Sequence, residues 1–64
     1  MRLGDWVRIN SMRPHKEKYR GYVGQVRVIT NRDIVYVQVG ENTPNFYIYE
    51  LEEVAAPREL GGMA

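Results

Sequence analysis

The chain contains no cysteine, which excludes both a disulfide framework and a thiolate metal site. No apolar run approaches the roughly 20 residues that a membrane-spanning helix requires. The first ten residues, MRLGDWVRIN, lack the apolar centre of a signal peptide. From these absences we expect a soluble protein of a reducing, cytoplasmic compartment that does not insert into a membrane.

Side chains suited to catalysis are also scarce, because the chain has one histidine and one serine. Ser11 and His15 share a polar segment in which no third group would orient them, as a catalytic triad requires. A lone histidine with scattered carboxylates lacks the ligand spacing of a metal site. Glu50, Glu52 and Glu53 are interpreted as solvated charges on a terminal turn rather than as an acid–base pair. We therefore predict a protein that is not an enzyme and that has neither a cofactor nor a metal.

A length of 64 residues allows one domain, and 44% hydrophobic residues are enough to build a small core. The charge is unevenly distributed along this domain. Residues 1–32 carry eight Lys or Arg against two acidic residues, a balance of +6, whereas residues 33–64 carry one against six, a balance of −5. Such asymmetry can steer an encounter with a charged partner. The two halves can equally interleave in one fold so that their charges offset locally, and the sequence leaves both readings open.

Four short segments have the alternating pattern of half-buried β-strands. They are DWVRI (5–9), GYVGQVRVI (21–29), IVYVQV (34–39) and FYIY (46–49). In the central pair the alternation predicts one inward face, made by Val26, Val28, Val35, Val37 and Val39. In the last segment it predicts that Phe46 and Ile48 share a face. Gly24 indicates a bend, a bulge or a close approach of two backbones.

The segments between these strands predict turns and one long loop. TNRD (30–33) and GENTPN (40–45) are turns, and Asn31 can adopt the left-handed conformation that a tight turn requires. Residues 10–20 are polar, basic and broken by Pro14, which favours a long loop. ELEEV (50–54) predicts a helical turn and then a last strand, with Leu51 and Val54 pointing inward together.

Five short antiparallel strands with a long basic first loop describe an all-β, SH3-like small barrel. Closure of the sheet is how so short a fold removes its exposed edges. The barrel is predicted to span residues 1–55, and residues 56–64 are interpreted as a flexible C-terminal tail.

Several motifs together resemble the small stromal subunit of photosystem I that assists ferredoxin docking. They are Gly-Asp-x-Val-Arg-Ile (4–9), Arg13-Pro14, Tyr19, Val23-Gly24-x-Val26, Asn45-Phe46 and Glu50-Leu51-Glu52-Glu53-Val54. The similarity covers most of residues 4–57 and extends to the variable chain of ferredoxin–thioredoxin reductase. It implies an SH3-like barrel without chemistry of its own. The implied role is to bind a larger protein complex at the cytoplasmic or stromal face of a membrane, and there to assist the docking of ferredoxin, an acidic redox protein.

Two further resemblances suggest other functions. The motif G-x-V-x-V in residues 21–28 is similar to the KOW segment of ribosomal and transcription-elongation proteins, which implies a barrel that binds RNA or DNA. The pair Ile48-Tyr49 is similar to the active strand of the plasmid-encoded, trimethoprim-resistant dihydrofolate reductases. That likeness implies a tetrameric enzyme, whereas the sequence by itself leaves the oligomeric state open.

The basic first loop and the aromatic end of the fourth strand form the candidate partner-binding surface. Its cations could pair with phosphates while a tyrosine stacks on a base, or they could face carboxylates of an acidic protein. Exposed tyrosines would add a protein-contact patch. The candidate partner-binding residues are Arg8, Arg13, Lys16, Lys18, Tyr19, Arg20, Tyr47 and Tyr49.

Overall fold

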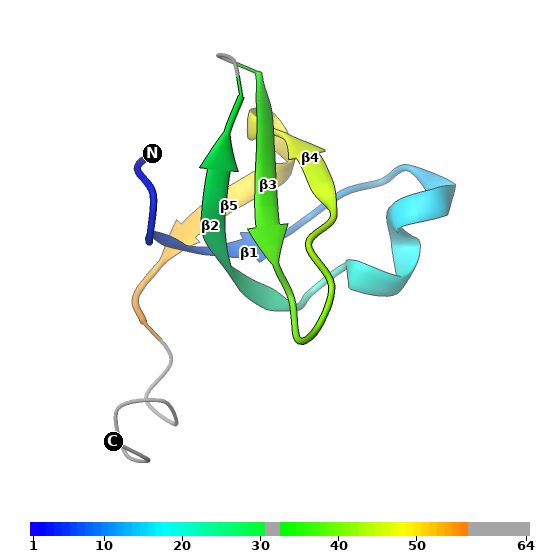
Figure 1. Ribbon diagram of the computed structural model, residues 1–64. Helices are drawn as coiled ribbons and strands as arrows, with labels where there is room; N and C mark the ends of the chain where they lie inside the picture. The colour runs from blue at the N-terminus through cyan, green and yellow to red at the C-terminus, as the bar shows by residue number, and fades with distance from the viewer. Residues whose placement is uncertain (31–32, 57–64) are drawn as a thin grey trace.

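The computed structural model describes residues 1–30 and 33–56, in which five antiparallel strands form one sheet. The strands are β1 (Trp6–Ile9), β2 (Val23–Ile29), β3 (Ile34–Gln38), β4 (Asn45–Tyr47) and β5 (Leu51–Val54). Their order across the sheet is β4-β3-β2-β1-β5, and the sheet is strongly curved (Figure 1). The prediction of a small all-β, barrel-like fold is therefore confirmed. Within the described residues, no helix is long and apolar enough to cross a membrane.

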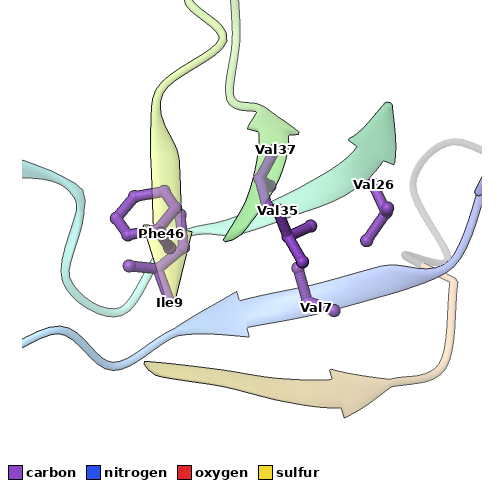
Figure 2. Packing of buried hydrophobic residues seen from close by; sticks show 6 residues of the cluster. All are labelled: Val7, Ile9, Val26, Val35, Val37 and Phe46. Carbon is purple, nitrogen blue, oxygen red and sulfur yellow. The ribbon is translucent and has the colours of Figure 1, made fainter. Parts of the chain in front are cut away.

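The core lies inside the curved sheet. Its six side chains come from β1, β2, β3 and β4 and converge on one another (Figure 2). Each is at most 1% exposed; they are Val7, Ile9, Val26, Val35, Val37 and Phe46. Because successive side chains of a strand point to opposite faces, alternate positions reach this interior. Each buried aliphatic or aromatic side chain contributes about 1.5–3 kcal/mol, so this small set stabilises most of the fold.

One predicted core residue is outside the core. Val28 is 46% exposed, whereas Val26, two positions earlier, is buried. The pairing of β2 with β3 shifts between these two residues, which is a β-bulge. A bulge adds one residue to one strand and so reverses the alternation beyond it. The prediction for Val28 was wrong for this reason.

Gly24 marks a close approach of two strands, one of the three features that its position indicated. A Cβ atom added to this buried glycine would lie 2.6 Å from the backbone oxygen of Gln38 and 2.6 Å from Cγ1 of Val37. Any larger residue would therefore push β2 away from β3 at this point.

Two short 3₁₀ helices differ from the predicted pattern. Most of the predicted first loop is the helix η1 (Pro14–Tyr19), which projects from the side of the sheet (cyan in Figure 1). Pro14 begins this helix instead of breaking the segment, since its fixed φ and missing N–H suit a first helical position. The predicted helical turn is η2 (Ile48–Glu50), which lies earlier than expected, so β4 ends at Tyr47 and Ile48 is 37% exposed.

The last strand shows why Leu51 and Val54 do not point inward together. Leu51 pairs with the buried Ile9 and packs against the core, whereas Val54 pairs with the half-buried Trp6. Positions three apart on a strand face opposite ways. The predicted left-handed Asn31 and residues 57–64 of the predicted tail lie outside the described residues.

Candidate docking surface

A buried carboxylate organises the region between the first loop and η2. Glu50 is 5% exposed and accepts four hydrogen bonds. Ser11 Oγ donates to Oε2 at 2.5 Å, and the Tyr47 backbone N–H donates to Oε1 at 2.9 Å. Arg13 donates twice, from Nε to Oε2 at 2.9 Å and from Nη2 to Oε1 at 2.6 Å. This bidentate pair ties the start of η1 to the end of η2, and the bond from Tyr47 ties the same carboxylate to the end of β4.

The surroundings of Glu50 keep it ionised. Burial by itself would raise the pKa of Glu50, but the hydrogen bonds from Arg13, Ser11 and Tyr47, together with the Arg13 charge, outweigh it and hold the pKa below its ordinary value. The same hydrogen bond raises the pKa of Arg13. Both partners therefore remain charged at neutral pH, and their opposite charges neutralise each other.

Arg13 also lies against an aromatic stack. Its guanidinium carbon is 4.8 Å from the ring centroid of Tyr47, close enough for a cation–π contact. The rings of Tyr47 and Tyr49 are parallel to within 3°, with centroids 5.4 Å apart. Tyr47 thus contacts both Arg13 and Tyr49, and we call these three residues the column. Tyr49 is its most exposed member, at 78%.

Beside this column is an open cavity of about 400 Å³, which we call the Tyr49 groove. Met12, which is 75% exposed, and the exposed Pro14 give the groove an apolar rim together with Tyr49. The lining residues are Asn10, Met12, Arg13, Pro14, Tyr49 and Glu50. Exposed apolar side chains gathered around fixed polar groups are typical of a site where another molecule binds.

The cations of η1 are partly engaged within the protein. Lys16 Nζ donates to Asn45 Oδ1 at 3.1 Å and lies 5.2 Å from the Phe46 ring centroid. Burial and the nearby Arg13 charge lower the pKa of Lys16. Lys18 lies over the ring of Tyr19, 5.3 Å from its centroid, and is exposed. Lys18 is therefore the η1 cation most available to a partner.

The other predicted site residues are placed as follows. Tyr19 is half-buried, edge-on to the core ring of Phe46 at 6.0 Å. Arg20 donates from Nε to the backbone oxygen of Ser11 at 2.8 Å. Arg8 is paired with Glu52 at 3.0 Å on the outer face of β1 and β5, away from the Tyr49 groove.

The ion pairs Arg13–Glu50 and Arg8–Glu52 each join a cation of the first half to an acid of the second half. The fold thus offsets part of the asymmetry seen along the sequence.

Sequence reasoning missed the residues that hold this surface together. Glu50 was interpreted as a solvated charge, and this was wrong because it is buried and hydrogen-bonded to Ser11, Arg13 and Tyr47. Ser11 was judged to have no orienting group, yet its hydroxyl is fully buried and fixed by Glu50. Asn10 and Met12 were not singled out. The spacing of 39 residues between Ser11 and Glu50 leaves no local signal for their contact.

The residues of the enzymatic readings are placed as follows. His15 is exposed in η1, whereas Ser11 is buried beneath Arg13 and Glu50. Ile48 and Tyr49, the pair similar to the reductase strand, lie in the helix η2 and not in a strand. In residues 1–30 and 33–56, no group of three or more His, Cys, Asp or Glu side chains could hold a metal ion.

Comparison with known proteins gives no relative, because no protein family, curated protein or solved structure matches this chain.

Proposed function

We propose that this protein is a non-catalytic docking subunit that binds a larger protein complex through the Tyr49 groove. The observation that carries the proposal is the exposed end of the Arg13–Tyr47–Tyr49 column, because it offers a large aromatic surface that is already ordered. Rigid tyrosines lose little conformational entropy on binding and are enriched among residues that dominate interface energies. Met12 and Pro14 extend this apolar surface at the groove rim.

The charges beside the groove favour an acidic partner. Arg13 is neutralised by Glu50, so the available positive charge comes from Lys18 and, in part, from Lys16 on the neighbouring helix η1. Such rim charges raise association rates and select the partner's sign more than they add affinity. The resemblance to the small stromal subunit of photosystem I supports the same role. It also suggests an acidic redox protein as a further partner and a peripheral position of this protein on a membrane complex.

A nucleic-acid role through the basic loop is supported less well. Affinity for phosphates depends on the number of cations that can replace counterions. Arg13 is held by Glu50, Arg20 by the Ser11 carbonyl and Arg8 by Glu52, so three of the candidate cations already have partners.

Affinity capture with the full chain tests the proposal. Tagged protein is incubated with an extract of the source organism, with and without nuclease, and captured proteins are compared between wild type, Tyr49→Ser and Tyr22→Ser. Tyr22 is 58% exposed but does not line the groove, so it is the matched control.

We expect one set of proteins to be captured by wild type and Tyr22→Ser and lost with Tyr49→Ser, whether or not nuclease is present. Capture that nuclease abolishes, or that Tyr49→Ser leaves unchanged, would overturn the proposal.

A further inference from the structure

A second cavity, of about 330 Å³, lies on the outer face of the sheet and shares no residue with the Tyr49 groove. It is lined by Trp6, Val23, Gln25, Gln38 and Gly40, which come from β1, β2, β3 and the turn after β3. Its volume is at the lower end of the range for small-molecule sites. We call it the outer-face cavity.

The strand register explains how this cavity is built. Trp6 is directly opposite Gln25 in the pairing of β1 with β2, and Gln25 is directly opposite Gln38 in the pairing of β2 with β3. Cross-strand partners lie on the same face of a sheet, with Cβ atoms about 5 Å apart. An indole ring and two amides therefore stand in one row across β1, β2 and β3, which are neighbours in the sheet (Figure 1).

Both amides form hydrogen bonds within the protein. Gln25 Nε2 donates to the Gly4 carbonyl at 3.1 Å, and Gln25 Oε1 accepts from Arg27 Nη1 at 3.3 Å. Gln38 Nε2 donates to the Gly40 carbonyl at 3.3 Å. This leaves Gln38 with one amide N–H and the whole of Oε1 for a ligand, since no described residue hydrogen-bonds to that oxygen.

The chemistry of the lining suits an uncharged, flat group of a ligand. None of the five lining residues is ionisable, and Trp6 supplies an aromatic surface on which a planar ring can stack. A glutamine amide presents a donor and an acceptor side by side, which matches the N6 amino group and N7 of adenine. Arg27, next to Gln25, forms no ion pair with a described residue and could meet a phosphate attached to such a ring.

We propose that the outer-face cavity binds an adenine base, which stacks on Trp6 and forms a bidentate pair with the amide of Gln38. This site is independent of the proposed docking function, because the two cavities have no residue in common. The base could belong to a free nucleotide or to a single-stranded nucleic acid.

Fluorescence titration tests the site directly, because Trp6 is the single tryptophan of the chain. Adenosine, AMP, an eight-residue oligoadenylate and glucose are titrated into the full chain. We expect saturable quenching by adenosine and AMP, and tighter binding of AMP. Glucose, a neutral ring without a base, should not quench.

Substitutions test which residues contact the ligand. Gln38→Leu should weaken AMP binding by roughly tenfold or more, the usual loss for one bidentate base contact. Gln38 is exposed, so this change leaves the core intact. Asn10→Leu makes the same chemical change in the Tyr49 groove and should leave AMP binding unaltered. Arg27→Gln should remove the preference for AMP over adenosine.

Tighter binding of the oligoadenylate than of AMP would identify single-stranded nucleic acid as the source of the base, and equal binding would identify a free nucleotide. No saturable quenching by any adenine compound, quenching by glucose of equal strength, or an unchanged affinity in Gln38→Leu would overturn the proposal. None of these outcomes bears on capture through Tyr49, so failures of the two proposals are distinguishable.

Discussion

Replacement of Glu50 by glutamine tests whether the buried carboxylate holds the docking surface in place. The amide keeps the size of the side chain but removes its charge and turns one acceptor oxygen into a donor. If the remaining oxygen keeps the bond from the Tyr47 N–H, the new amino group faces Arg13 Nε and Ser11 Oγ. The serine hydroxyl can rotate to accept a hydrogen bond, whereas the guanidinium cannot.

The expected cost follows from the bonds that are lost. A hydrogen bond to a charged group contributes about 1.5–3 kcal/mol, and breaking a buried ion pair on one side costs about 3–5 kcal/mol. The Arg13 side chain is 32% exposed, so water compensates part of this loss. We therefore expect the free energy of unfolding to fall by about 2–4 kcal/mol. A domain of this size has roughly 3–10 kcal/mol in total.

Urea denaturation followed by Trp6 fluorescence measures this change. Glu52→Gln is the matched control, because Glu52 pairs with Arg8 on the exposed outer face and such pairs contribute about 0–1 kcal/mol. If Glu50→Gln is destabilised by no more than Glu52→Gln, the carboxylate does not organise this region and the reasoning fails.

The pH dependence of stability gives a second readout for the same residue. The pKa of Glu50 is lower in the folded state than its ordinary value of 4.5, so the unfolded chain takes up the proton more readily. The stabilisation is fully present above pH 4.5 and is lost as the pH falls through the lower folded value. Glu50→Gln should flatten this acid limb. An acid limb as steep as that of wild type would contradict the assignment.

Three further substitutions test the packing of the hairpin. Gly24→Ala should destabilise the fold by about 1–3 kcal/mol, because its Cβ would overlap the backbone of β3; an unchanged urea midpoint would refute the close approach. Val28→Thr should shift the free energy of unfolding by less than about 0.5 kcal/mol, whereas Val26→Thr buries a hydroxyl and should cost about 1–3 kcal/mol. Equal effects of the two threonines in thermal unfolding would contradict the bulge.

The strands could be predicted because their signal is local. In β1 and β3 the side chains alternate without interruption, and Val7, Ile9, Val35 and Val37 are buried as the pattern indicates. The predicted burial of Val28 was wrong because a bulge depends on how β2 pairs with β3. The residues of β2 alone do not specify that pairing. The prediction that Pro14 breaks its segment was wrong because proline can end one segment or begin a helix.

The candidate site was predicted in part. Arg13, Tyr47 and Tyr49 were singled out as partner-binding residues, and the structure brings them into contact with one another. Their fixed geometry depends on Glu50, whose burial no neighbouring residue signals. The row of Trp6, Gln25 and Gln38 could likewise not be predicted from the sequence, since its members come from three strands.

The amino-acid sequence by itself determined the all-β class, the position of the strands and the identity of most of the core, because alternation of side chains is a property of a single strand. Only the tertiary structure decided which carboxylate is buried, which cations are neutralised and where the two cavities lie. These features depend on contacts between segments far apart in the sequence, such as that between residues 11 and 50, and on the pairing of three strands. The residues of one segment alone do not specify such contacts.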